Sequence, residues 1–175
     1  MAIQAGTYKL GPDNADLRVQ TGRSGAAAKA GHNLTLGVTS WDATLEVGDS
    51  SSLELNADAT SLEVLKGEGG AKSLDDGDKA DIKKSIDKDI LKKQDIQFRS
   101  SDVQTTDSGL TISGDLSIAG KSAPVSFDVS VADDGTLTAG TTLTQSNHGI
   151  KPYSALFGAL KVNDDVEVLV EGKVS

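Results

Sequence analysis

The stretch from Ile96 to Gln145, "IQFRSSDVQTTDSGLTISGDLSIAGKSAPVSFDVSVADDGTLTAGTTLTQ", decides the fold class. Apolar and polar residues alternate in four runs, which the turn clusters "TTDSG", "KSAP" and "ADDG" separate. Alternation with a period of two predicts β-strands that bury one face. The pair Asp134-Gly135 favours a tight two-residue hairpin turn, because both residues tolerate positive φ.

The same alternation continues on both sides of this stretch. In "WDATLEV", Trp41, Ala43 and Leu45 share one face, and "LELNADA" repeats the pattern after the turn "GDSS", which predicts a hairpin. "VEVLVEGKV" adds another strand near the end of the chain. Because a meander has unpaired edges unless it closes, we expect an all-β, mainly antiparallel fold: a lipocalin-like up-and-down barrel of about eight strands, with residues 1–175 as one domain.

One segment, "DDGDKADIKKSIDKDILKKQ" (75–94), breaks the strand pattern. Ile82, Ile86 and Ile90 recur every four residues, which predicts an inserted amphipathic α-helix with an apolar stripe on the protein and lysines in water. Asp78 is the expected cap of its first turn. Six lysines against three aspartates between 79 and 93 suggest transient contact with an anionic membrane, although a solvated face explains them more simply.

A second short segment, "PYSALFGALKV" (152–162), is too long for a tight turn and is apolar on one side. The spacing of its apolar residues predicts a helical turn or short helix at the barrel mouth, with Pro152 in its first turn. It serves either as a lid through which a lipid enters or as a plug that seals the core. The residues assigned to the mouth are His148, Ile150, Tyr153, Leu156 and Phe157.

An eight-stranded barrel has room for packed side chains or for one small ligand, so the fold leaves a filled core and a cavity both open. The residues expected to line a cavity follow from the inward phase of the strands. They are Leu34, Leu36, Trp41, Leu45, Phe98, Leu116, Ile118, Phe127, Val129 and Leu143.

The composition excludes several classes of site. The chain contains no cysteine, so disulfides and thiolate chemistry are absent. Its net charge of -9 disfavours nucleic acid as a partner. "AGKS" at 119–122 lacks the glycine spacing and the helix of a phosphate loop, and no metal site, cofactor or catalytic residue is predicted. No apolar stretch is long enough to cross a membrane, and the absence of a secretion signal predicts a cytoplasmic protein.

Three stretches together resemble the YceI-like family of polyisoprenoid-binding, lipocalin-like barrels. Residues 6–47 are similar to the family's opening, with Tyr8 at the start of the first strand and His32 further on. "IKKSIDKDILKKQDIQFRSSDV" is similar to its helix leading into a strand, and "SGDLSIAGKSAPVSFDV" matches its most recognisable run. The chain looks most like the short cytoplasmic members from actinobacteria.

The resemblance implies a barrel whose apolar interior holds an isoprenoid tail or another long amphiphile. We therefore expect a protein without catalytic activity that binds, sequesters or transports a long-chain lipid such as a polyisoprenoid, an isoprenoid quinone or a fatty acid. Two alternatives stay open: a lipid-modifying enzyme that uses His32 or His148, and a filled, stress-related barrel without a ligand. Dimerisation through an exposed face is also left open.

Overall fold

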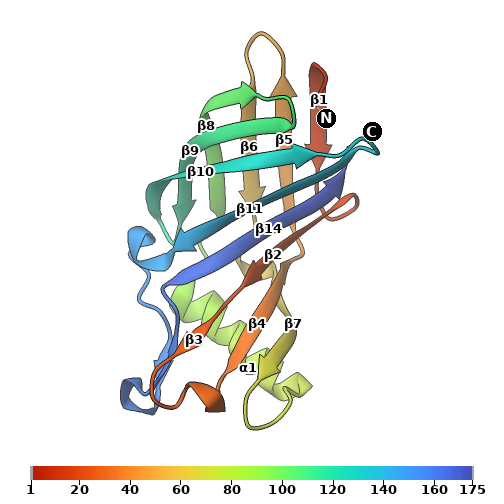
Figure 1. The fold of residues 1–175 in the computed structure, drawn as a ribbon. Helices are drawn as coiled ribbons and strands as arrows, with labels where there is room; N and C mark the ends of the chain where they lie inside the picture. The colour runs from red at the N-terminus through yellow and green to blue at the C-terminus, as the bar shows by residue number, and fades with distance from the viewer. Residues whose placement is uncertain (1, 175) are drawn as a thin grey trace.

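The computed structural model describes residues 2–174, which form one strongly curled antiparallel sheet of eleven strands with a helix against it (Figure 1). The strand order is β1-β5-β6-β8-β9-β10-β11-β14-β2-β4-β7. The strands of this sheet are β1 (Gly6–Leu10), β2 (Ala15–Gln20), β4 (His32–Val38), β5 (Trp41–Val47), β6 (Ser52–Ala57), β7 (Leu62–Gly69), β8 (Ile96–Thr105), β9 (Gly109–Ile118), β10 (Lys121–Val131), β11 (Thr136–Thr144) and β14 (Asp165–Lys173).

The remaining elements lie between these strands. A second, three-stranded sheet has the order β12-β13-β3. Its strands are β3 (Arg23–Ser24), β12 (Ser154–Ala155) and β13 (Leu160–Val162). The helical elements are α1 (Asp76–Ser85), its π-helical continuation η3 (Ile86–Ile90), and the 3-10 turns η1 (Ala28–Ala30), η2 (Ala59–Ser61), η4 (Gln145–His148) and η5 (Leu156–Gly158).

The all-β antiparallel class and the inserted helix are confirmed, but the eight-stranded up-and-down barrel is wrong. Strands β8 to β11 pair in chain order, as the alternation predicted. Strands that are distant in the sequence also pair, β1 with β5 and β14 with β2. Alternation alone does not reveal these pairings. The sheet curls into a half-barrel with β1 and β7 at its edges, and the helix that follows β7 covers part of its concave side (Figure 1).

The tight turns differ from those expected. The two-residue turn joins β9 to β10 at Ala119–Gly120, where φ is 52° and 80°. At Asp134-Gly135 only Gly135 has positive φ, and the loop is longer. "KSAP" is the start of β10 rather than a turn. Pro124 is tolerated there because β10 pairs with β11 only through residues 129–131, so no strand needs its missing N–H.

The helix begins one turn earlier than expected. Asp75, not Asp78, is its N-cap, and the two residues form a reciprocal capping box in which each carboxylate accepts a hydrogen bond from the other's backbone N–H. Lys83 also departs from the prediction that the lysines face water. Its ammonium donates hydrogen bonds to the carbonyls of Thr60 (2.6 Å) and Leu62 (2.9 Å), which fixes the helix to the start of β7.

Of the segment 152–162, predicted to form a helical turn or a short helix, only Leu156–Gly158 forms a 3-10 turn, and no longer helix is present. The segment forms the hairpin β12–β13, with η5 at its tip, and β13 pairs with β3. Leu156 and Phe157 have φ of 53° and 57°, a left-handed conformation that interrupts any helix. The spacing of apolar residues misled the prediction because it is shared by a helix and by a tight hairpin whose tip turns sharply.

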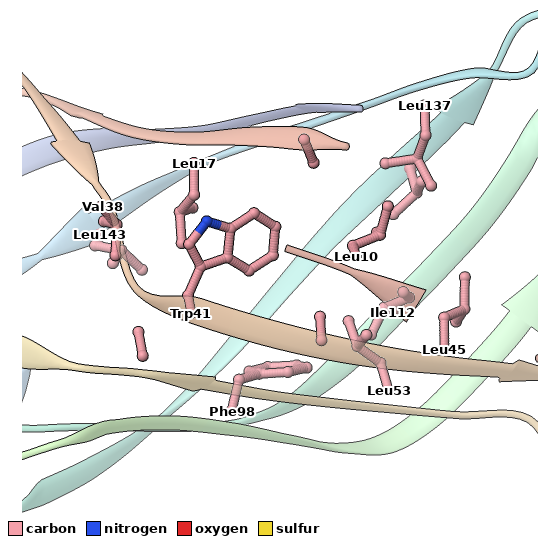
Figure 2. Packing of buried hydrophobic residues seen from close by; sticks show 14 of the residues in the cluster. Leu10, Leu17, Val38, Trp41, Leu45, Leu53, Phe98, Ile112, Leu137 and Leu143 are labelled. Carbon is pink, nitrogen blue, oxygen red and sulfur yellow. The ribbon is translucent and has the colours of Figure 1, made fainter. Parts of the chain in front are cut away.

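The core fills the half of the sheet's interior that lies away from the helix. Trp41 belongs to the same buried cluster as Leu10, Leu17 and Phe98, and in Figure 2 its indole ring lies between Leu17 and Leu10, above Phe98. Ile112 and Leu110 are the most deeply buried large side chains in the described part of the chain. The face predicted for β5 is confirmed, because Trp41 and every second residue after it are buried. This half of the interior is packed with side chains.

Candidate functional site

The other half of the interior is hollow. A cavity of about 440 Å³ lies between the sheet and the helix, within the range of small-molecule sites. Its apolar wall comes from strands β2, β4, β7, β8, β9, β11 and β14, and from the helix. The apolar lining consists of Val19, Leu34, Leu36, Leu62, Ile82, Ile86, Ile90, Leu91, Ile96, Ile118, Leu143, Ile150, Leu160, Val162, Val166 and Val168, with Ala30 and Gly31.

Individual strands contribute side chains to both the hollow half and the filled half. On β4, Leu34 and Leu36 line the cavity, and Leu36 is also buried in the core cluster. Val38, two residues further along the same face, is buried in that cluster and does not line the cavity (Figure 2). On β2, Val19 lines the cavity and Leu17 packs beside Trp41 (Figure 2). The boundary between the hollow and the filled half therefore runs across the strands. The sequence left a filled core and a cavity both open, and each of the two describes one half of the molecule.

Four of the residues expected to line a cavity do so in the structure: Leu34, Leu36, Ile118 and Leu143. The other six lie outside it. Trp41, Leu45, Phe98 and Val129 are buried in the core, and Leu116 and Phe127 are partly buried against it. Phe98 and Phe127 form a tilted pair with their ring centroids 5.5 Å apart. Whether any of these residues touches a ligand stays a prediction.

The residues assigned to the mouth also divide. His148, Ile150 and Tyr153 line the cavity, whereas Leu156 and Phe157 at the hairpin tip do not. Phe157 is fully exposed, and its side chain contributes nothing to the cavity wall. The positive φ of both tip residues turns the chain away from the mouth, which periodicity did not indicate.

The helix supplies a lining that was not predicted. Ile82, Ile86 and Ile90 all face the cavity, and Leu91 joins them where the π turn ends. None of the residues of α1 or η3 is fully buried, and the three isoleucines pack against the edge of the core while they line the cavity. The four-residue spacing of the isoleucines predicted that the stripe faces the protein. The sequence did not indicate that a cavity lies in front of it.

Charged and polar groups gather at the end of the cavity built by β3, the start of β4, α1 and the hairpin. They are Arg23, His32, Asp81, Ser85, Tyr153 and Lys161. Arg23 donates hydrogen bonds from Nη1 to the carbonyls of Gly31 (2.5 Å) and Glu68 (2.9 Å), so it ties β3 to the ends of two neighbouring strands. The cavity lining is thus mainly apolar, with its charged side chains on these elements and with Thr21, Gln145 and His148 as further polar lining.

Both histidines are held by backbone carbonyls. Nε2 of His32 lies 2.6 Å from the oxygen of Lys72, and Nδ1 of His148 lies 3.0 Å from the oxygen of Lys121. Because a carbonyl only accepts, each of these ring nitrogens carries the hydrogen. His148 is buried and fixes η4 to the start of β10, which explains its position without a catalytic role. Within residues 2–174, His, Asp and Glu side chains form no cluster of three or more that could hold a metal ion.

The capping box beside this end carries a perturbed carboxylate. The backbone N–H of Asp75 donates to Asp78 and lowers the pKa of that carboxyl below its ordinary value of 3.8, and the nearby Lys72 ammonium acts in the same direction. Asp78 is therefore ionised at neutral pH and holds the first turn of the helix in place.

The family follows from a comparison with domain models. A model described as a YceI-like domain matches residues 8–174. The chain belongs to the YceI-like family. This confirms the resemblance drawn from the sequence. The YceI-like family is generally associated with binding isoprenoid-like lipids, and its members are generally binding proteins rather than catalysts.

Solved structures of YceI-like proteins show the same fold. The chain is similar to BcnA of Burkholderia cenocepacia, with 16% identity and a TM-score of 0.62 over 90% of this chain and 94% of that one. It is also similar to the YCEI protein of Campylobacter jejuni, with 14% identity and a TM-score of 0.56 over 80% and 84% of the two chains. A search of curated proteins finds no match. In the part of the chain that the structure describes, no helix is both long and apolar enough to span a bilayer.

Proposed function

We propose that this protein binds and carries a long-chain amphiphile, such as a polyisoprenoid, an isoprenoid quinone or a fatty acid, in the cavity between sheet and helix. The observation that carries the proposal is the cavity itself: about 440 Å³ of space whose walls are aliphatic and whose charged groups lie at one end. A protein interior normally packs without such voids, and an unfilled apolar cavity costs stability. A bound hydrocarbon tail would remove that cost.

The polar end gives the ligand a direction. Arg23 and Lys161 offer positive charge there, and Tyr153 combines an apolar ring with a hydroxyl. The tail of the amphiphile lies against the isoleucines of the helix, and its head group lies among these polar side chains. This orientation leaves no head-group oxygen in the aliphatic part of the cavity, where it would lack a hydrogen-bond partner.

Native mass spectrometry of the purified chain, followed by solvent extraction, tests this function. We expect a species carrying one lipid per chain, and uptake of one added C20 isoprenoid alcohol by chains freed of lipid. A single apo mass that does not change with added isoprenoid alcohols or fatty acids would contradict the proposal. The enzymatic alternative is not proposed, because in residues 2–174 neither histidine has a hydrogen bond to a carboxylate or hydroxyl, which that alternative requires. The predicted cytoplasmic location stays a prediction that cell fractionation can test.

A further inference from the structure

The tip of the β12–β13 hairpin presents unpartnered apolar side chains to solvent. Leu156 is 58% exposed and Phe157 110%, so the phenyl ring is as accessible as in an extended peptide. Both residues also have positive φ, which costs free energy for residues that carry a Cβ. An exposed phenylalanine in a conformation of this kind contributes nothing to folding, which points to a role in contact with something outside the chain.

The charge around this tip is opposite to that of the whole protein. Two segments, 21–32 and 145–163, build the small sheet and its surroundings. Their charged residues are Arg23, Lys29, Lys151 and Lys161, and neither segment contains an aspartate or glutamate. The chain as a whole has 26 acidic and 17 basic side chains. The two segments therefore combine an apolar tip with basic side chains, while Asp164 directly follows the second segment and Asp81 lines the adjoining end of the cavity. An apolar tip with lysines beside it suits a surface that is negatively charged outside and apolar beneath.

The tip also adjoins the polar end of the cavity. Tyr153, Leu160 and Lys161 of the same hairpin segment line that end. The 24–31 loop is fixed beside the hairpin by a hydrogen bond from the Ala27 N–H to the Ala159 carbonyl (2.8 Å). In Figure 1 the hairpin lies next to β3, at the end of the molecule where β4 and β7 meet the start of α1. A surface that received the tip would therefore lie near the charged side chains that line the cavity.

We propose that the tip formed by Leu156 and Phe157, with the surrounding lysines, docks on the surface of an anionic lipid bilayer. The phenyl and leucyl side chains enter the boundary between head groups and acyl chains, while Lys29 and Lys151 lie over the anionic head groups. Contact of this kind is reversible, because two buried side chains and a few lysines anchor far less firmly than a spanning helix. The inference goes beyond ligand binding, since docking does not require an occupied cavity.

An exposed apolar tip could instead bind a second copy of the chain. A two-fold contact through this tip would place the same lysines opposite each other, because both subunits of such a dimer use one patch. The resulting repulsion disfavours self-association, whereas an anionic head-group layer neutralises the lysines. The charge of the tip therefore favours the bilayer.

Sedimentation with vesicles tests the proposal with the full chain. We expect binding to vesicles of phosphatidylcholine mixed with phosphatidylglycerol, weaker binding to phosphatidylcholine alone, and a decline as salt rises. The variant Leu156→Asn/Phe157→Asn should bind the mixed vesicles at least about tenfold less, since it removes two apolar side chains from the interface. Asparagine suits the left-handed backbone, so this variant should fold. The control Leu169→Thr alters an exposed leucine on β14 and should bind as the unaltered chain does.

A matched pair of charge variants separates this tip from the lysines of the helix. Lys29→Gln/Lys151→Gln should lower binding to the mixed vesicles roughly thirtyfold, at about 1 kcal/mol per lysine near the surface. Lys92→Gln/Lys93→Gln, which removes the same charge at the end of the helix, should leave binding unchanged. Equal losses in both variants would overturn the assignment of the tip, because they would indicate nonspecific attraction.

Fluorescence gives a second readout that does not depend on these losses. Trp41 is the one tryptophan of the chain and is buried, so its emission should not respond to vesicles. Phe157→Trp should add an emission that shifts to shorter wavelength when mixed vesicles are added. No shift, or no binding of the unaltered chain, overturns docking, and so does a dimer in sedimentation equilibrium that Leu156→Asn/Phe157→Asn abolishes. None of these results bears on whether the cavity holds a lipid, which mass spectrometry measures independently.

Discussion

Ile96 and Phe98 lie two residues apart on the same face of β8, yet Ile96 lines the cavity and Phe98 is buried in the packed core. A similar transition occurs on β4 between Leu34, which lines the cavity, and Val38, which is buried in the core and does not line it. The interior of this sheet is therefore divided into a filled and a hollow half, and substitutions of the same kind should have different effects on stability in the two halves.

Enlarging a side chain tests this division directly. Val168 lines the cavity beside Val19, its cross-strand partner, so Val168→Phe should be accommodated with little change in the free energy of unfolding. The added ring occupies ligand space and should weaken lipid binding roughly tenfold, or about 1.4 kcal/mol. Ala43→Phe in the filled half is the matched change and should destabilise the protein by about 1–3 kcal/mol through overpacking. Urea denaturation and lipid titration measure both effects, and equal destabilisation would contradict a hollow half.

The attachment of the helix to β7 should control access to the cavity. Lys83 donates to two carbonyls, lies 3.5 Å from a carboxylate oxygen of Glu63 and 3.6 Å from one of Asp87, and its side chain is only 27% exposed. Lys83→Gln removes these charged contacts and should cost about 1–3 kcal/mol. It should also speed amide hydrogen exchange in the helix and release of bound lipid.

The neighbouring Lys84 is exposed and provides the control for this prediction. Lys84→Gln should leave amide exchange and lipid release close to those of the unaltered chain. If both variants released lipid equally fast, the contact of Lys83 with β7 would not be what holds the helix over the cavity.

Stability should fall at acidic pH because four carboxyls have lowered pKa values, three of them through hydrogen bonds that include a backbone N–H. Side-chain and backbone hydrogen bonds from Thr60 lower the pKa of Asp58, those from Thr136 lower that of Asp134, and the Asp75 amide lowers that of Asp78. A carboxyl whose pKa is lower in the folded state stabilises that state above the unfolded value, near 3.9, and the stabilisation is lost as pH falls through the folded value.

We therefore expect the urea midpoint to be nearly constant between pH 5 and 7 and to fall below about pH 4. The triple variant Asp58→Asn/Asp78→Asn/Asp134→Asn should be less stable than the unaltered chain at pH 7 and should lose less stability on acidification. If the triple variant lost as much stability on acidification as the unaltered chain, other groups would be responsible for that loss.

Sequence periodicity revealed the strands and their inward faces because burial of one face requires alternation. It did not reveal how strands distant in the chain pair, so the pairing of β1 with β5 and the edge at β7 were missed and the strand number was too low. A turn as short as Ala119–Gly120 was misplaced because alanine rarely adopts positive φ.

The candidate site was predictable only in part, for a related reason. Alternation shows that Phe98 and Leu34 both point inward, but it contains no information on depth along the curled sheet, which decides that Phe98 is buried in the core and Leu34 lines the cavity. Ile82 and Ile86 were identified as a stripe facing the protein. That the stripe faces a void depends on the position of the helix across the curled sheet, which is a tertiary property.

The most direct test of the account is a methyl NMR titration of isoleucine-labelled protein with an isoprenoid alcohol. The chain has eight isoleucines, of which Ile82, Ile86, Ile90, Ile96, Ile118 and Ile150 line the cavity, whereas Ile3 and Ile112 lie in the packed core. The account predicts that the δ1-methyl signals of the six shift and saturate together while those of Ile3 and Ile112 stay in place. Signals that do not move at a saturating ligand concentration, or a shift led by Ile112, would contradict it.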